Sequence, residues 1–176
     1  YLGYYHSDVQ SDVKVDGRTV DVTYSVTLGD RYKIDKIDFS VPEGEFSRDF
    51  YADTANISVK PGDYLSEYAL EQETERSAAW FRRNGWFGFT KNYYAFEADT
   101  LQKRDTADLL MMIREYTRNQ SPENARPFRK YHFGDVNISW DKDLHFNRRV
   151  LRNMNTIKPG DLYDEVVVNN TYSRLS

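Results

Sequence analysis

Few side chains in this 176-residue chain have the types and spacings that enzymes use for catalysis. No pair of histidines has the spacing of metal ligands. The histidines are His6, His132 and His145. Acidic pairs would suit general acid and base chemistry, but they lie in charged runs, which are usually solvated faces. These pairs are Glu73 with Glu75 and Asp141 with Asp143. With no G-x-S-x-G, no H-E-x-x-H and no glycine-rich phosphate loop, the chain is predicted to be a non-enzyme without metal or cofactor.

Binding is the second chemistry that the residue types allow, and its candidates lie in an aromatic-rich run over residues 87–98. Aromatic side chains can form a platform for a sugar or a peptide, but they also favour strands for their own sake. About half of them must be core in any sheet, so each residue alone is no argument for a site. As a group they favour a binding role. The candidate residues are Phe89, Lys91, Asn92, Tyr93, Tyr94 and Phe96.

A helix followed by a glycine stop must position this run. Pro61-Gly62 is a turn signal, and Ser66 is a suitable N-cap ahead of residues that favour helices. Asn84-Gly85 offers the left-handed conformation that ends a helix, and Trp86-Phe87 begins the extended run. A stripe of small residues between two large apolar ones would let the helix pack closely on a sheet. The stripe is Leu70, Thr74, Ser77, Ala78 and Phe81.

The other elements are mostly strands. Residues 1–28 are predicted to form a hairpin around Asp16-Gly17, with alternating apolar and polar residues in its second strand. A third strand follows over 32–39, with an irregularity between Ile34 and Ile37 where the alternation slips. A short helix is predicted within 45–56 and a second hairpin over 87–98 and 106–116. Only 117–128 has the composition of a linker.

Composition narrows the class of protein. The mass of 20.8 kDa suits one ordinary domain or two small ones, and no apolar run approaches the roughly 20 residues of a membrane-spanning helix. The net charge of -4 is opposite in sign to that expected of a nucleic-acid-binding protein, so no nucleic acid is expected as a partner. The absence of cysteine excludes disulfides and thiolate catalysis. It fits a reducing compartment as well as an oxidising one.

The sequence repeats itself. Residues 59–63 (Val-Lys-Pro-Gly-Asp) recur at 157–161 (Ile-Lys-Pro-Gly-Asp), a shift of 98, which also places Asp164 where Ser66 stands. The strand over 32–39 recurs at 131–138 with a shift of 99. Gly3-Tyr4-Tyr5 parallels Gly85-Trp86-Phe87 in the same way. The chain is therefore predicted to contain the tail of one repeat, one whole repeat and the head of a third.

The whole repeat has the order strand, helix, helix, strand, strand. This order, with a Gly-aromatic-aromatic segment closing the second helix, resembles the POTRA (polypeptide-transport-associated) domain of the Omp85 superfamily of outer-membrane assembly proteins, BamA-like and TamA-like. The resemblance implies an α+β fold of tandem units, each a three-stranded mixed sheet with two helices on one face. Its last strand would be central, and the strand after Phe87 would be an exposed edge.

The resemblance also implies the domain boundaries. Residues 1–28 resemble the C-terminal hairpin of a preceding unit, 31–116 a complete unit, 117–128 a linker and 129–176 the N-terminal part of a following unit. The chain is accordingly expected to be a fragment of a longer one, whose flanking units need cover for their apolar faces. Structural roles are expected for the turn, the stop and the core. These residues are Pro61, Gly62, Phe81, Gly85, Trp86 and Phe87.

The function implied by the resemblance is that of a periplasmic arm of an outer-membrane protein. It would bind unfolded β-barrel proteins by strand addition at the edge, assisted by the helix face near Leu70 and Thr74. Accessory periplasmic or lipoprotein subunits, neighbouring POTRA units and a membrane β-barrel in the same parent chain are the other implied partners. The alternative is a spacer domain of a division or secretion complex without peptide handling. A carbohydrate-binding module is a third possibility, raised by the tyrosine and tryptophan content.

Overall fold

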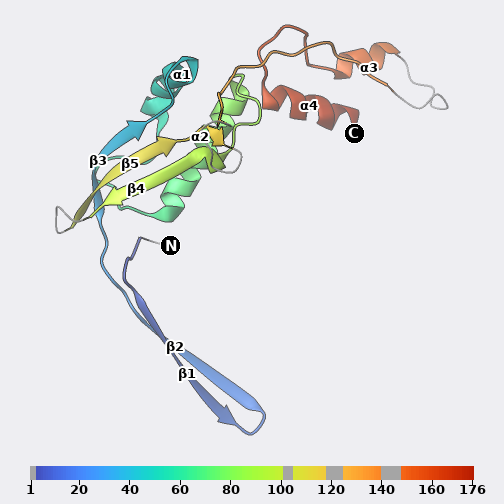
Figure 1. Cartoon of the computed structure of the whole chain (residues 1–176). Helices are drawn as coiled ribbons and strands as arrows, with labels where there is room; N and C mark the ends of the chain where they lie inside the picture. The colour runs from blue at the N-terminus through green and yellow to red at the C-terminus, as the bar shows by residue number, and fades with distance from the viewer. Residues whose placement is uncertain (1–2, 101–104, 118–124, 140–147) are drawn as a thin grey trace. The chain divides into compact units, whose positions relative to one another are not determined.

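The computed structural model describes residues 3–100, 105–117, 125–139 and 148–176 (Figure 1). The chain divides into two compact units. The first consists of Tyr1–Ser40, Asn56–Glu73 and Ala95–Met112, and the second of Val41–Ala55, Thr74–Tyr94 and Ile113–Ser176. Strands and helices follow one another in the α+β order predicted from the sequence. No helix in the described ranges is both long and apolar enough to cross a membrane.

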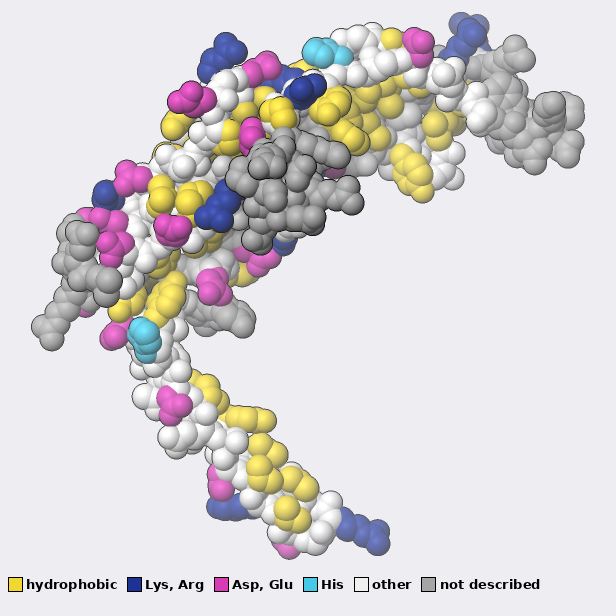
Figure 2. Space-filling view, in the orientation of Figure 1, with side chains coloured by type: hydrophobic (Ala, Val, Ile, Leu, Met, Phe, Trp, Pro, Cys, Tyr) yellow, Lys and Arg dark blue, Asp and Glu magenta, His cyan; other side chains and the backbone are white. Residues whose placement is uncertain are grey.

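The first unit begins with a hairpin of β1 (Asp8–Asp16) and β2 (Thr19–Thr27). The strands pair antiparallel up to Asp16 and Thr19, and Gly17 takes the positive φ of +58° that the tight turn requires. The predicted hairpin is confirmed. Its side chains are exposed throughout, including a row of apolar residues visible in yellow in Figure 2. These are Val9, Val13, Val15, Val20, Val22, Tyr24 and Val26.

The three-stranded sheet has the order β3-β5-β4 (Figure 1), with β3 at Lys33–Ser40, β5 at Thr106–Ile113 and β4 at Tyr94–Asp99. The last strand is central, as the resemblance implied, and β3 lies parallel to it. The pairing of β3 slips between Ile34 and Lys36, which confirms the predicted irregularity. Every second residue of β5 is buried, so one face of the central strand is covered.

The core of the first unit is aliphatic. The turn at Pro61-Gly62 is held against β3, because the Ile34 N–H donates to the Asp63 carbonyl at 2.9 Å and the Gly62 N–H donates to the Ile34 carbonyl at 2.7 Å. Gly62 has a φ of +95°, which only glycine adopts without strain. The buried apolar residues of this unit are Ile34, Ile57, Val59, Leu65, Leu70, Ala107, Leu109 and Met111.

Helix α2 (Glu67–Arg83) begins in the first unit and ends in the second. Ser66 caps it as predicted, since its Oγ accepts the Ala69 N–H at 3.5 Å. At the other end the Trp86 N–H donates to the Phe81 carbonyl at 3.1 Å, and Gly85 has the predicted positive φ, +92°. The whole predicted stripe from Leu70 to Phe81 is buried.

The second unit has an aromatic core. α1 (Glu45–Asp53), followed by the 3-10 turn η1 (Thr54–Asn56), contributes Phe46, which lies 4.6 Å from Phe81 and 5.3 Å from Phe89 between ring centroids. Phe128 lies 4.5 Å from Phe46 by the same measure. The range predicted as a linker thus contains a half-buried side chain that packs on this core, and it also holds β7 (Ala125–Arg126), which pairs with β6 (Tyr116–Thr117).

The C-terminal part carries α3 (Arg148–Met154) and α4 (Glu165–Leu175). Asp164 caps α4, its carboxylate accepting the Val166 N–H at 2.8 Å. The strand predicted over 131–138 is wrong: the described residues there form a single bridge, His132 to Leu162. A strand needs a ladder partner along its length, and the structure places no such partner beside this segment within the described ranges.

Candidate functional site

Strand β4 is an edge of its sheet, but it begins later than the sequence pattern predicted. Lys91, Asn92 and Tyr93 form the 3-10 turn η2 (Lys91–Tyr93), and the run 87–90 has no strand structure. The aromatic pattern changes phase near Lys91-Asn92, which predicts a bulge in the strand there, but the structure has the turn η2 instead. Phe89 is 2 % exposed and packs on Phe81, so it belongs to the core and offers nothing to a ligand.

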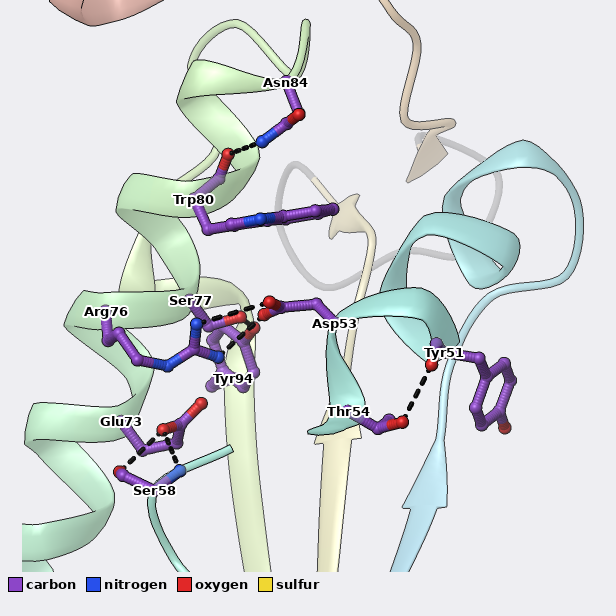
Figure 3. A network of polar contacts seen from close by, with 10 residues as sticks. All are labelled: Tyr51, Asp53, Thr54, Ser58, Glu73, Arg76, Ser77, Trp80, Asn84 and Tyr94. Carbon is purple, nitrogen blue, oxygen red and sulfur yellow. Dashed lines mark hydrogen bonds and ion pairs between the residues drawn. The ribbon is translucent and has the colours of Figure 1, made fainter. Parts of the chain in front are cut away.

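The first residue of β4 is tied to α2. The hydroxyl groups of Tyr94 and Ser77 share a hydrogen bond of 2.5 Å (Figure 3). Just before it, the Tyr93 N–H donates to the Thr90 carbonyl at 3.2 Å, and the Arg114 N–H donates to the Tyr93 carbonyl at 2.9 Å. The edge therefore starts at a fixed point, with Tyr93 and Tyr94 half-buried.

The bond from Arg114 to Tyr93 also sets which way the edge residues face. Along an antiparallel strand, backbone groups alternate between facing the neighbouring strand and facing away. Counting by this alternation from the Tyr93 carbonyl, which accepts from Arg114 just after β5, we expect the N–H groups of Phe96 and Ala98 to face away from β5. Ala98 is exposed and Phe96 is half-buried.

An ion pair of Lys91 and Glu75 lies at the start of this edge. The Lys91 ammonium lies 2.8 Å from a carboxylate oxygen of Glu75, and both side chains are largely exposed. Natural edge strands use lysine and short length to discourage unwanted pairing, and β4 has only six residues. Lys91 is therefore placed at the start of the edge, although outside the strand itself.

Polar contacts join α2 to Ser58 and to Asp53 of α1 (Figure 3). In the first unit, the Glu73 carboxylate is 1 % exposed and accepts both the backbone N–H and the hydroxyl of Ser58, at 2.8 and 2.7 Å. In the second unit, Arg76 donates to the buried carboxylate of Asp53 at 2.7 Å. Glu73, first considered as a catalytic acid, is thus a structural acceptor. Removing Arg76 would leave the buried charge of Asp53 uncompensated.

The helix face expected to assist binding is not at the surface. Leu70 is 8 % exposed and Thr74 is 4 % exposed. The small-residue stripe to which they belong is the packing face of α2, so neither side chain can contact a peptide in this structure. The surface around the edge is instead made by Ala98, Phe96 and the Lys91–Glu75 pair.

The structural residues lie largely where the sequence placed them. Pro61 and Gly62 form the turn, and Phe81 is fully buried. Trp86 is 2 % exposed and its indole N–H donates to Asp49 at 2.9 Å, whereas Phe87 is 60 % exposed. Sequence reasoning gave no role to Asp49, Asp53 or Phe128, because their partners lie far along the chain.

Two tyrosines near charged residues have raised pKa values. Burial raises the pKa of Tyr163 above its ordinary value of 10.0, and the nearby Glu165 carboxylate raises it further, although Arg82 opposes them. Burial and Glu67 raise the pKa of Tyr5 in the same way. In the described part of the chain, no three side chains of His, Asp or Glu gather in a group that could hold a metal ion.

The raised pKa of Tyr163 predicts a loss of stability in alkali. The unfolded chain loses its phenol protons near pH 10 while the folded chain retains that of Tyr163, so the stabilisation is complete below pH 10 and disappears as the pH rises through the folded pKa. Urea denaturation at a series of pH values should show a shallower alkaline decline for Tyr163→Phe. The control is Tyr172→Phe, at an exposed position of α4, which should keep the wild-type slope. Equal slopes in all three proteins would contradict this prediction.

Comparisons with known proteins point to the fold. No family model matches the sequence, and no curated protein sequence does. The structure is similar to that of POTRA domains 3–5 of BamA from Haemophilus influenzae, with a TM-score of 0.59 and 15% identity over 98% of this chain. The match covers 62% of that chain, so the present chain spans less than two thirds of it.

Two further solved structures match more loosely. BamA from Haemophilus ducreyi lacking POTRA domains 1–3 is 21% identical, with a TM-score of 0.43 over 65% of this chain and 20% of that one. POTRA domains 1–3 of the periplasmic domain of Omp85 from Anabaena are 13% identical, with a TM-score of 0.34 over 99% and 65%. The chain has the POTRA fold, as the match to the H. influenzae domains shows.

Proposed function

We propose that this chain is part of the periplasmic POTRA arm of an outer-membrane protein assembly or translocation factor. It binds extended segments of unfolded β-barrel proteins by adding them as a strand at β4. The observation that carries the proposal is the edge position of β4 in a sheet whose fold is that of BamA POTRA domains. Fold alone does not determine function, so the site must be argued from its own chemistry.

Strand addition fits the chemistry of this edge. An exposed edge offers N–H and C=O groups to any extended chain, so affinity comes from the backbone and makes little demand on sequence. Such a mode suits a protein that receives many different barrel strands. The short length of β4 and the charged pair of Lys91 and Glu75 at its start keep binding weak. Weak binding suits a site that must pass its substrate on.

The remaining roles follow from the same proposal. Residues 31–116 are a complete POTRA unit, with 1–28 and 129–176 belonging to the preceding and following units and 117–128 connecting the last two. Neighbouring POTRA units, a membrane β-barrel in the same parent chain and accessory periplasmic or lipoprotein subunits are its partners. The protein acts in the periplasm and is not an enzyme.

A spacer role is the second candidate function. It is favoured by the hydrogen bond between Tyr94 and Ser77, which ties the start of the edge to α2 and shortens the stretch that a peptide can use. A spacer would have the same fold and the same core, and it would bind no extended peptide. Direct titration distinguishes the two functions.

The test is an NMR titration with a peptide of about 10 residues taken from a membrane β-barrel strand. Amide signals of residues 94–99 should shift. Ala98→Pro removes an N–H that faces away from β5 and should abolish the shifts while the rest of the spectrum stays folded. Ala98→Val, which keeps the N–H, should retain them. A proline at Tyr93 would disrupt η2 instead and is not a clean test.

The outcomes separate the proposals. Shifts confined to other surfaces, or none at millimolar peptide, would leave the spacer function in place. Equal loss of shifts in Ala98→Pro and Ala98→Val would show that the side chain, not the backbone N–H, is responsible, and would contradict strand addition.

A further inference from the structure

Two Gly-aromatic-aromatic segments in this chain dock on surfaces of the same design. In the first unit, Gly3-Tyr4-Tyr5 meets Arg31-Tyr32 and Tyr64-Leu65. We call this contact the first junction. In the second unit, Gly85-Trp86-Phe87 meets Lys130-Tyr131 and Leu162-Tyr163. We call this contact the second junction.

The ring and cation contacts correspond pair by pair. Tyr5 lies edge-on to Tyr32, with 5.7 Å between ring centroids. Its counterpart Phe87 lies edge-on to Tyr131 at 5.8 Å. The Arg31 guanidinium lies 5.0 Å from the centroid of Tyr4, and the Lys130 ammonium lies 5.6 Å from that of Trp86. A cation over the first ring and a tyrosine against the second are therefore common to both junctions.

The glycines and the surfaces that receive them also correspond. Gly3 and Gly85 have φ values of +82° and +92°. A Cβ on Gly3 would lie 2.3 Å from the Leu65 carbonyl oxygen, and a Cβ on Gly85 would lie 2.7 Å from a methyl group of Leu162. Each receiving surface is closed by the same backbone bond. The Leu65 N–H donates to Tyr32 and the Tyr163 N–H donates to Tyr131, both at 2.8 Å.

The two junctions differ in the groups that pair with their cation, which is Arg31 in the first and Lys130 in the second. Arg31 lies between the rings of Tyr4 and Tyr64, 3.6 Å from the centroid of the latter. Its buried Nε finds no hydrogen-bond partner, and no acidic side chain pairs with it, among the residues the structure describes. The first junction is therefore held by cation–π and edge-on ring contacts and by shape.

The second junction is held by charge as well. The Lys130 ammonium lies 2.8 Å from Asp49 and 3.6 Å from Glu45. Asp49 also accepts the indole N–H of Trp86, so one carboxylate joins the ring and the cation of this junction. Nearby, Arg82 donates to Glu165 at 2.7 Å. All four charged groups of the two shortest pairs are roughly a third exposed or less, so the pairs are only partly screened by water.

We infer that one docking surface, specific for a positive-φ glycine followed by two aromatic rings, joins consecutive repeats in this chain, and that its second copy is an electrostatic clamp that salt loosens. The first copy keeps its hold at the same salt concentration. The two junctions therefore open independently, because a rise in ionic strength weakens the second junction and not the first. This inference does not depend on peptide binding at β4.

Amide exchange measures the two junctions separately in the intact chain. The Tyr131 N–H donates to the Gly85 carbonyl at 2.9 Å across the second junction, and the Tyr5 N–H donates to the backbone carbonyl of Asp30 at 2.8 Å beside the first. Raising the salt to about 1 M, where the Debye length is ~3 Å, should speed exchange at Tyr131 about five- to tenfold. Exchange at Tyr5 should change less than about twofold, since no ion pair among the described residues holds the first junction.

Substitutions sharpen the test. Lys130→Met should speed exchange at Tyr131 at low salt and reduce its salt dependence, leaving the part that comes from Arg82 and Glu165, while Lys130→Arg should stay close to wild type. Lys158→Met removes one positive charge at an exposed position of the turn that precedes Leu162 and should leave exchange at Tyr131 unchanged. The Leu70 N–H, bonded to Ser66 at 3.0 Å in α2, reports that the fold is intact. Equal salt effects at Tyr5 and Tyr131, or equal effects of Lys130→Met and Lys158→Met, would overturn the inference.

Discussion

Replacing Phe81 by alanine is expected to lower the free energy of unfolding by about 3–5 kcal/mol, the usual cost of deleting a fully buried phenylalanine. The side chain is 0% exposed. Its ring stacks on Phe46 at 4.6 Å and lies 4.7 Å from Phe89, so its removal leaves a cavity bordered by rings that cannot collapse easily. Urea denaturation followed by circular dichroism measures the loss.

The matched control for this variant lies on the same helix. Tyr68 is 62% exposed at the start of α2, and Tyr68→Ala should change stability by no more than about 0.5 kcal/mol. Finding that Phe81→Ala costs no more than Tyr68→Ala would mean that the aromatic core of the second unit contributes little to stability.

Gly85→Ala is expected to lower the stability of the second unit through two separate effects. A positive φ costs an L-residue about 1–2 kcal/mol, and a side chain forced into a packed site costs a further 1–3 kcal/mol or so. Both costs apply at Gly85, where φ is +92° and a Cβ would lie 2.7 Å from Leu162 Cδ1, and the second cost lies at the low end of its range because the Leu162 side chain is 38% exposed and can move. The stability of the variant should fall by roughly the sum of the two costs.

Gly160 separates these two costs. Its φ of +88° is nearly the same, but a Cβ there would have no atom within 4 Å. Gly160→Ala should therefore lose only the backbone part, about 1–2 kcal/mol. If the two variants lost equal stability in the same urea titration, close packing of Gly85 against Leu162 would not be a feature of the molecule.

Local signals in the sequence predicted much of this fold. Asp16-Gly17 predicted the first hairpin turn, Ser66 the start of α2 and Asn84-Gly85 its end, because each depends on backbone preferences of a few neighbouring residues. The slip between Ile34 and Lys36 was also readable, since a bulge interrupts the alternation of apolar residues. The order of the sheet, with its last strand central, was implied by the resemblance to the POTRA domain and not by any local signal.

Features set by distant partners could not be predicted. Phe87 and Phe89 have strand propensity, yet one packs beside Tyr131 and Tyr163 and the other in the core, so β4 starts only at Tyr94. Phe128 lay in a range with the composition of a linker, and only the positions of Phe46 and Phe89 explain why its half-buried ring packs on the core. Propensity is overridden wherever tertiary packing decides.

The proposed binding residues divide in the same way. Tyr94 and Phe96 do lie on the edge strand, because an extended aromatic run was correctly recognised there. Leu70, Thr74 and Phe89 are buried, because the apolar and small residues that suggest a contact surface are also those that build a core. Charged pairs such as Lys91 with Glu75 carry no sequence signal at a separation of 16 residues.

Cysteine trapping tests strand addition at β4 most directly. The chain contains no cysteine, so Ala98→Cys provides a unique thiol on the edge, and Ala52→Cys provides a matched exposed control on α1. Peptides from a barrel strand, each with one cysteine at a successive position, are incubated with either variant under mild oxidation. Strand addition predicts disulfide yields at position 98 that alternate with a period of two along the peptide, because successive side chains of an added strand point to opposite faces. At position 52 the yields should be low and the same for every peptide. Even yields at position 98, or yields at position 52 as high as those at 98, would contradict it.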